Sequence, residues 1–222
     1  MSSDKTPIDA GAFIRTNTAV ATPPLVPEIR LHLASEVTPL WHATEASLAQ
    51  SQLPPPYWAF AWAGGQALAR YLLDHPDQVA GRFVLDFGAG SGLVAIAAAK
   101  AGAEFVLAAE IDHFAAAAIA ANGALNKAAV TVTTADVIDA ADPRWAIITA
   151  GDVCYEQPMA GRVTAWLRAL ARSGSLVLLG DPGRAYLPAE GLRERARYLV
   201  PTSREIEDRE TREAVVWEVL PG

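Results

Sequence analysis

The fold of this chain is decided by Val84-Leu85-Asp86-Phe87-Gly88-Ala89-Gly90-Ser91-Gly92. This run begins as a short buried strand, passes through a turn with three glycines, and opens the apolar helix expected at Leu93–Ala101. Glycine has no Cβ, so the backbone can approach a ligand closely, and the start of the helix offers free N–H groups. In a doubly wound sheet the first such turn lies beside the crevice where ligands bind. The run therefore predicts a small-molecule site, and the alternative is a tight turn without a ligand.

Strands and helix-length segments alternate on both sides of this turn. The expected strands are Arg82–Phe87, Phe105–Ile111, Val130–Thr134, Ala146–Ala150, Leu176–Leu179, Ser203–Asp208 and Ala214–Leu220. The expected helices are Gly65–His75, Leu93–Ala101, 113–126, one from Pro158, and a charged helix around 189–198. Parallel neighbours need a crossover, and a helix usually provides it. We therefore expect an α/β fold with a doubly wound, mostly parallel sheet that ends in an antiparallel C-terminal hairpin.

The beginning of the chain has a different composition. Residues 1–56 are rich in Pro, Thr and isolated apolar residues and end in three consecutive prolines. Within them Ile29, Leu31 and Leu33 alternate as in a strand. We expect an N-terminal extension over 1–56, which covers the crevice, and one main domain over 57–222.

Composition and charge exclude several classes of protein. The 222 residues carry 18 Lys and Arg against 25 Asp and Glu, and this net charge of −7 opposes a nucleic-acid backbone. The single Cys154 and four scattered histidines give no spacing typical of a metal site, so no metal is expected. No secretory signal and no apolar run long enough to span a membrane is visible. The expected protein is cytoplasmic, with no nucleic-acid or membrane partner.

The spacing of the glycines distinguishes between nucleotide-like ligands. A dinucleotide fingerprint beginning at Gly88 and Gly90 would need Gly or Ala where this chain has Leu93. The pattern D-x-G-x-G-x-G instead resembles motif I of the class I, seven-strand S-adenosylmethionine-dependent methyltransferases. That resemblance implies a Rossmann-like sheet in which Gly88, Ala89 and Gly90 pass close to the methionine part of S-adenosylmethionine. Asp86 would act on its polar groups, directly or through water.

Two acidic residues after the next strands complete the cofactor site that this resemblance implies. Glu110 would accept both ribose hydroxyls, since a carboxylate offers two acceptor oxygens in one plane, and Ile111 beside it would contact the cofactor. Asp136 would bind the adenine amino group. The alternatives are a solvated strand end for Glu110 and a turn cap for Asp136.

A second motif, Gly151-Asp152-Val153-Cys154-Tyr155, follows the fourth strand. It resembles the D-x-x-Y signature of the seven-strand protein lysine methyltransferases. The segment 56–69, PYWAFAWAGGQALA, is similar to the electron-transfer flavoprotein beta-subunit lysine methyltransferases and their bacterial relatives. Together the resemblance covers roughly residues 54–181 and implies a monomeric class I methyltransferase whose protein substrate is that beta subunit.

The resemblance also assigns roles to individual residues. Asp152 and Tyr155 are the expected catalytic residues: Asp152 contacts the cofactor and orients the lysine amine, and Tyr155 lines the methyl-transfer channel. Trp58 and Trp62 would line the cofactor or lysine channel, because ring faces hold cations; core packing is their alternative. A turn cap and a partly buried aromatic are the alternatives for Asp152 and Tyr155.

The chemistry of lysine methylation agrees with such a site. Lysine has a reference pKa near ~10.4, so its neutral form costs about 4 kcal/mol near neutral pH. A neighbouring sulfonium and burial both favour the neutral amine, and Asp152 then orients it. A general-base role for Asp152 is the alternative. Proximity and alignment supply the remaining acceleration.

Other functions stay open from the sequence. A small-molecule or ribosomal-protein methyltransferase would share the glycine turn. A nicotinamide-dependent oxidoreductase is disfavoured by Leu93. A regulator that binds the cofactor without catalysis would keep the same site.

Overall fold

The computed structural model describes residues 9–35, 38, 40, 55–140, 142, 144–202 and 210–222. The helices of these residues are α1 (Ala10–Asn17), η1 (Tyr57–Ala59), α3 (Ala63–Asp74), η2 (Pro76–Gln78), α4 (Leu93–Lys100), α5 (His113–Asn126) and α6 (Met159–Arg172). The strands are β1 (Ala19–Ala21), β2 (Leu31–Leu33), β3 (Phe83–Phe87), β4 (Phe105–Ala109), β5 (Thr131–Thr133), β6 (Ile147–Gly151), β7 (Leu176–Asp181), β8 (Leu192–Pro201) and β9 (Thr211–Val219). No described helix is long and apolar enough to cross a membrane.

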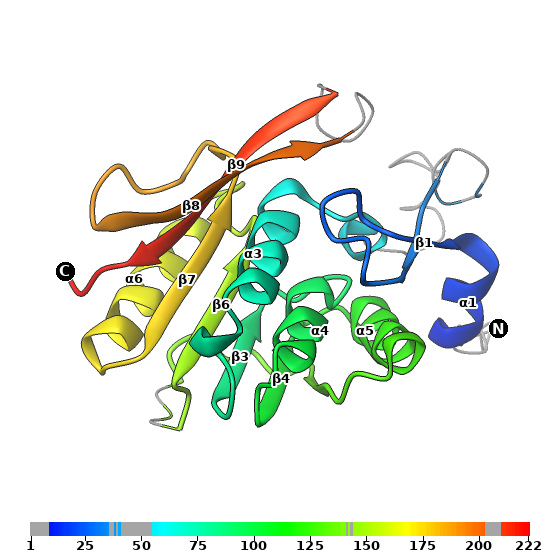
Figure 1. The fold of residues 1–222 in the computed structure, drawn as a ribbon, viewed down its shortest axis with the longest axis horizontal. Helices are drawn as coiled ribbons and strands as arrows, with labels where there is room; N and C mark the ends of the chain where they lie inside the picture. The colour runs from blue at the N-terminus through cyan, green and yellow to red at the C-terminus, as the bar shows by residue number, and fades with distance from the viewer. Residues whose placement is uncertain are drawn as a thin grey trace, which may run out of the picture.

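Seven of these strands form one sheet in the order β5-β4-β3-β6-β7-β9-β8 (Figure 1). Neighbours from β5 to β7 are parallel, whereas β9 is antiparallel to both β7 and β8. From β3 the chain adds β4 and β5 on one side of the sheet, and from β6 it adds β7 on the other side. The predicted doubly wound sheet with an antiparallel C-terminal hairpin is confirmed.

Alternate residues of the central strands are buried on opposite faces of the sheet. Val84, Ile147 and Leu178 belong to the core that α3 and α4 cover, and Figure 1 shows α3, α4 and α5 side by side. Leu85 and Ile148, each one residue further on, belong to the core on the other face, where α6 packs. The continuous apolar runs of the sequence follow from this burial on both sides.

The switch in strand order determines where a ligand can bind. The chain leaves β3 through α4 towards β4 and leaves β6 through α6 towards β7, so the two connections diverge. A crevice opens outside the carboxyl ends of strands at such a point. The glycine turn after β3 and the Asp152 segment after β6 both lie at this edge.

The prediction of a charged helix around 189–198 is wrong, because this segment is strand β8, paired with β9. Ala196, Tyr198 and Val200 alternate inward, and Arg197 and Leu199 between them are exposed. Cross-strand ion pairs join β8 to β9: Arg193 and Arg195 with Glu218, and Arg197 with Glu213. Alternating charge suits an edge strand as well as a solvated helix, and pairing with β9 decided between them.

The C-terminal hairpin therefore begins earlier in the chain than expected. The predicted strand at Ser203–Asp208 lies outside the described residues, and its place as the partner of the last strand is taken by β8. The last strand itself, expected at Ala214–Leu220, is β9.

The described part of the N-terminal extension packs on α5 and shares the main core. Ile29 and Leu31 are fully buried in the cluster that α3 and α4 also form. The backbone N–H groups of Arg30 and His32 donate to the side chains of Asn126 and Asn122 at 3.0 and 2.8 Å. Strand β2 confirms the alternation read from Leu31 and Leu33.

Helix α3 begins in very close contact with the sheet. A Cβ built at Gly64 would lie 2.3 Å from the carbonyl oxygen of Gly180 and 2.6 Å from Asp152 Oδ2. A Cβ built at Gly180 would lie 2.2 Å from the carbonyl oxygen of Gly64. Only a pair of glycines allows this approach, which brings the first turn of α3 against the ends of β6 and β7.

We expect Gly64→Ala to lower the free energy of unfolding by about 2–4 kcal/mol, because backbone would have to move to admit the methyl group. The adjacent Gly65→Ala is the matched control, since a Cβ there meets nothing within 4 Å and alanine favours the helix. Urea unfolding of both variants measures the difference. Equal stability of the two variants would contradict the close-contact explanation.

Candidate functional site

A cavity of about 440 Å³ lies at the carboxyl edge of the sheet. Most of the predicted site residues line it, namely Trp58, Trp62, Gly88, Gly90, Glu110, Ile111, Asp136, Asp152 and Tyr155. The other two, Asp86 and Ala89, border a small adjoining cavity of about 50 Å³, which the glycine turn and Asp152 also line. The structure thus brings together residues that are nearly one hundred positions apart in the sequence.

The glycine turn is held against the end of β4. The N–H groups of Gly88 and Gly90 donate to the carbonyl oxygen of Ala109 and to Glu110 Oε2, both at 3.0 Å. The φ angles of Gly88, Gly90 and Gly92 are 62°, 51° and 80°, in the left-handed region that favours glycine. This conformation explains why the turn needs all three glycines.

Asp86 lies beneath the turn, with only 1% of the residue exposed. Its carboxylate accepts hydrogen bonds from the N–H of Ala95 at 3.0 Å and from the hydroxyl of Thr149 at 2.8 Å. Burial raises its pKa to about 7, and these two hydrogen bonds oppose the rise. Asp86 therefore ties the first turn of α4 to β6, and its expected action on the cofactor stays a prediction.

Glu110 connects the glycine turn to the next strand. Its two oxygens accept hydrogen bonds from the N–H groups of Gly90 and Asp112 at 3.0 and 3.2 Å. Burial raises the pKa of Glu110 above its ordinary value, against these hydrogen bonds. A carboxylate has about four acceptor positions, so capacity remains for two hydroxyl groups of a ligand in the cavity.

Asp136 lies at the outer end of the cavity, in the loop after β5. One oxygen accepts a hydrogen bond from the N–H of Ile138 at 3.0 Å, as in a turn cap. The other lies 3.5 Å from the guanidinium of Arg162. The cap that the sequence left as an alternative is therefore present beside the cavity, and the adenine contact stays a prediction.

Asp152 has the most constrained geometry in the site. Its φ of 56° is unusual for a non-glycine residue and costs about 1 kcal/mol or more. Its N–H donates to the carbonyl oxygen of Gly180 at 2.9 Å, and its Oδ2 accepts the N–H of Gly65 at 2.8 Å. Burial raises the pKa of Asp152 to about 6, with Arg184 opposing. The start of α3 and the end of β7 thus orient this carboxylate.

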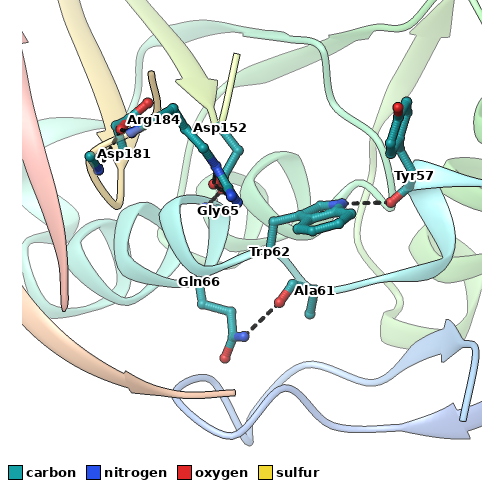
Figure 2. Close-up of polar contacts among 9 residues, drawn as sticks. Tyr57, Ala61, Trp62, Gly65, Gln66, Asp152, Asp181 and Arg184 are labelled. Carbon is teal, nitrogen blue, oxygen red and sulfur yellow. Dashed lines mark hydrogen bonds and ion pairs between the residues drawn. The ribbon is translucent and has the colours of Figure 1, made fainter. Parts of the chain in front are cut away.

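Arg184 lines the same cavity and was not predicted from the sequence. Its Nη2 and Nε lie 2.7 and 3.1 Å from Asp152 Oδ1, and its guanidinium carbon lies 5.5 Å from the centre of the Trp62 ring (Figure 2). One pattern in the sequence could have identified it: a charged residue shortly after a buried strand. The same pattern led to the prediction of Glu110. Asp181 and Arg184 follow β7 in the same way.

Aromatic rings form the wall between the cavity and solvent. Tyr57 contacts both Tyr155 and Trp62, with ring centres 5.6 and 6.2 Å apart. The indole N–H of Trp62 donates to the carbonyl oxygen of Tyr57 at 2.8 Å, which fixes that ring (Figure 2). Trp58 is almost fully buried and belongs to the core as well as to the cavity wall. Tyr155 is half exposed, so it stands at the rim.

In the part of the chain that the structure describes, no three His, Cys, Asp or Glu side chains lie close enough together to hold a metal ion. Cys154 is buried, and burial raises the pKa of its thiol to about 12. A thiol in that state is a weak nucleophile, so Cys154 acts as a packing residue.

The chain is similar to known methyltransferases over nearly its whole length. The family model of ribosomal protein L11 methyltransferase (PrmA) matches residues 66–150. The electron transfer flavoprotein beta subunit lysine methyltransferase of Xenopus laevis is 37% identical, over 95% of this chain and 87% of that protein. The chain belongs to the electron transfer flavoprotein beta subunit lysine methyltransferase family. The Danio rerio member is 38% identical, over 94% of this chain and 83% of that protein.

A solved structure agrees with this family at the level of the fold. Magnesium protoporphyrin IX methyltransferase from Synechocystis, solved with bound S-adenosylmethionine, superposes with a TM-score of 0.54 over 82% of this chain and 88% of that chain, at 17% identity. The chain thus has the Rossmann-like fold of that methyltransferase and belongs to a family of lysine methyltransferases.

The residues of the cavity fit S-adenosylmethionine. A volume of about 440 Å³ is in the range of small-molecule sites, and the lining is mostly apolar with a few polar groups. Carboxylates line the cavity, those of Glu110, Asp136 and Asp152 among them, and S-adenosylmethionine carries a sulfonium and an ammonium. The side-chain-free surface of the glycine turn adjoins the small cavity near Asp152. Charge and shape therefore both suit this cofactor.

We expect Glu110→Ala to weaken S-adenosylhomocysteine binding roughly 10- to 100-fold, because hydrogen bonds to a charged group contribute about 1.5–3 kcal/mol. Glu110→Gln should give a smaller loss, since its amide oxygen still accepts. Titration calorimetry measures both.

The control is Glu104→Ala, which removes an exposed glutamate at the opposite end of β4. Unchanged affinity in Glu110→Ala would show that this carboxylate does not bind the cofactor.

Proposed function

We propose that this enzyme transfers methyl groups from S-adenosylmethionine to lysine side chains of the electron transfer flavoprotein beta subunit. Its relatives are named for that reaction and cover nearly the whole chain. The single observation that carries the proposal is the position of Asp152 and Tyr155 on the wall of the same cavity as the glycine turn and Glu110. A lysine that enters past the aromatic rim would reach the methyl donor there.

The proposed division of work follows the geometry of the cavity. Glu110, Ile111 and Asp136 hold the adenosine end of the cofactor, and the glycine turn holds its methionine end. When bound, S-adenosylmethionine supplies a methyl group already activated by a sulfonium. Asp152 accepts a hydrogen bond from the lysine amine and so directs the nitrogen lone pair towards that methyl group.

The aromatic rim has two functions in this proposal. Tyr57, Trp62 and Tyr155 exclude water from the aliphatic part of the lysine, and their ring faces attract its cationic head on approach. Inside, loss of water favours the neutral amine, which lowers the cost of deprotonation. The Tyr155 hydroxyl stands at the rim, where it can contact the amine.

Further parts of the proposal concern the whole protein. We place it in the cytoplasm as a monomer without a nucleic-acid partner, which agrees with a net charge of −7 and a single buried cysteine. Residues 1–56 would form the extension and 57–222 the class I methyltransferase domain. Pro55 and Tyr57, on either side of that boundary, line the cavity, as a cover would require.

A second candidate substrate is a ribosomal protein. The family model of ribosomal protein L11 methyltransferase matches residues 66–150, which include the glycine turn and α3 from Gln66 onward. That segment ends before Asp152 and Tyr155, so it carries the cofactor half of the site and leaves out the residues assigned to lysine. The beta-subunit substrate is therefore favoured.

The purified enzyme should label the electron transfer flavoprotein beta subunit with tritiated methyl from S-adenosylmethionine. We expect Asp152→Ala to reduce the rate roughly 100-fold, because the amine loses its orienting acceptor. Asp77→Ala, an exposed aspartate in η2, is the matched control and should keep the rate. Mass spectrometry of the product identifies the modified lysine.

Other outcomes of this labelling experiment would contradict parts of the proposal. Label on ribosomal protein L11 and none on the beta subunit would favour the second candidate. Label only in small molecules from a lysate would contradict a protein substrate. Full labelling by Asp152→Ala would remove that residue from the mechanism.

A further inference from the structure

The guanidinium of Arg184 lies at the end of the cavity that Asp152 lines, where we propose that the lysine binds. This guanidinium is held by Asp152 Oδ1 on one side and faces the Trp62 ring on the other, as Figure 2 shows. Only 18% of the Arg184 side chain is exposed. Both nitrogens that reach Asp152 contact the same oxygen, at 2.7 and 3.1 Å. The other oxygen, Oδ2, accepts the N–H of Gly65.

The backbone of Arg184 is fixed by a second buried carboxylate. Asp181 Oδ1 accepts the N–H groups of Gly183 and Arg184, both at 2.7 Å. Asp181 is 1% exposed, and none of the described residues donates a hydrogen bond to its Oδ2. The turn after β7 is therefore anchored at the end of the sheet, so the guanidinium is presented to Asp152 by a rigid element.

The negative charge of Asp152 has two opposing effects on a lysine substrate. A carboxylate near the amine is a good hydrogen-bond acceptor and orients the nucleophile. The same negative charge, unbalanced, favours the ammonium form of the lysine, which has no lone pair for attack. A fixed positive charge beside the carboxylate removes this conflict, because the pair is close to neutral while the oxygens still accept hydrogen bonds.

We propose that Arg184 is a positioning residue for methyl transfer, which acts through Asp152: it fixes the carboxylate and balances its charge, so that the lysine binds as a neutral amine. This inference rests on the proposed lysine substrate. An arginine suits the task since it stays protonated throughout the working pH range and donates in a fixed plane.

The direction of the pH effect follows from the charges around Asp152. Burial raises the pKa of Asp152, Arg184 lowers it, the N–H of Gly65 lowers it and Asp181 raises it. The N-terminus of α3 contributes only backbone N–H groups at this point. Among the described residues, the other ionisable side chains around this end of the cavity include Tyr57, Asp86, Glu110, Cys154 and Tyr155.

Removal of the arginine charge would raise the pKa of two groups, Asp152 and the bound lysine. The pKa of Asp152 would rise, so the ionised acceptor would form at higher pH. Where Asp152 is ionised, the pKa of the bound lysine would also rise, so the neutral amine would form at higher pH. Both effects move the ascending limb of the pH–rate profile to higher pH.

The test is the single-turnover rate of methyl transfer to the electron transfer flavoprotein beta subunit, measured from neutral to alkaline pH at saturating S-adenosylmethionine. We expect Arg184→Gln to shift the ascending limb upward by about one pH unit, which is a tenfold loss at a fixed pH on the limb. The rate should recover at alkaline pH. Arg184→Lys, which keeps the charge, should show a smaller shift.

Arg193→Gln is the matched control. Arg193 also binds a carboxylate through Nε and Nη2. Its Nη2 lies 2.6 and 2.7 Å from Glu218 Oε1 and Oε2, and its Nε lies 3.1 Å from Oε2, on the edge strand β8. We expect its pH–rate profile to match that of the unaltered enzyme. Calorimetry with S-adenosylhomocysteine on Arg184→Gln and Arg184→Lys identifies folded variants.

The outcomes separate this inference from the proposed function. A loss of rate by the same factor at every pH, or no loss, in either folded Arg184 variant would overturn the role of Arg184 and leave the substrate assignment standing. No label from the unaltered enzyme on the beta subunit would overturn the substrate assignment itself. An upward shift in Arg184→Gln, reduced in Arg184→Lys, supports the inference.

Discussion

The site depends on one close contact, between the backbone of α3 and the ends of β6 and β7. Gly64 and Gly180 pass each other at a distance that no side chain allows. This contact brings the N–H of Gly65 to the carboxylate of Asp152, whose own N–H is held by the Gly180 carbonyl. The unusual φ of Asp152 persists because hydrogen bonds from two elements hold it. Without the glycine pair, α3 would lie further from the sheet, and the carboxylate of Asp152 would lose its hydrogen bond to Gly65 and its orientation.

Near this contact the enzyme has four acidic residues that are buried or partly buried. The pKa values of Asp86, Glu110, Asp152 and Asp181 are all raised, and burial is the largest cause in each case. Each carboxylate is held by backbone N–H groups or by a hydroxyl or guanidinium, which offsets part of the cost of burial. In the proposed reaction, a cationic cofactor and a lysine substrate give the charges of Glu110 and Asp152 a function. Part of the net charge of −7 is therefore concentrated where two positively charged molecules must meet.

The sequence predicted the sheet and most of the cavity wall for a common reason. A residue directly after a buried parallel strand must lie at the carboxyl edge, so Glu110 and Asp152 could be assigned to the site without coordinates. The same reasoning, carried past Leu179, would have reached Arg184. It could not have distinguished the partners of Asp86, since a carboxylate beneath a turn and one facing a ligand occupy the same sequence position. It also failed at β8, where a charged segment was interpreted as a solvated helix although its arginines recur with the period of two that is typical of a strand.

The sequence by itself determined the order of strands and helices up to β7, the glycine turn and the family, because these depend on local pattern: apolar runs, glycines and short motifs. The tertiary structure alone decided which groups share a charge or a hydrogen bond. Arg184 lies 32 residues from Asp152 and Gly65 lies 87, and no local rule links them. Such pairs form because parallel strands bring distant chain segments to one edge of the sheet. The chemistry of this enzyme depends on that juxtaposition.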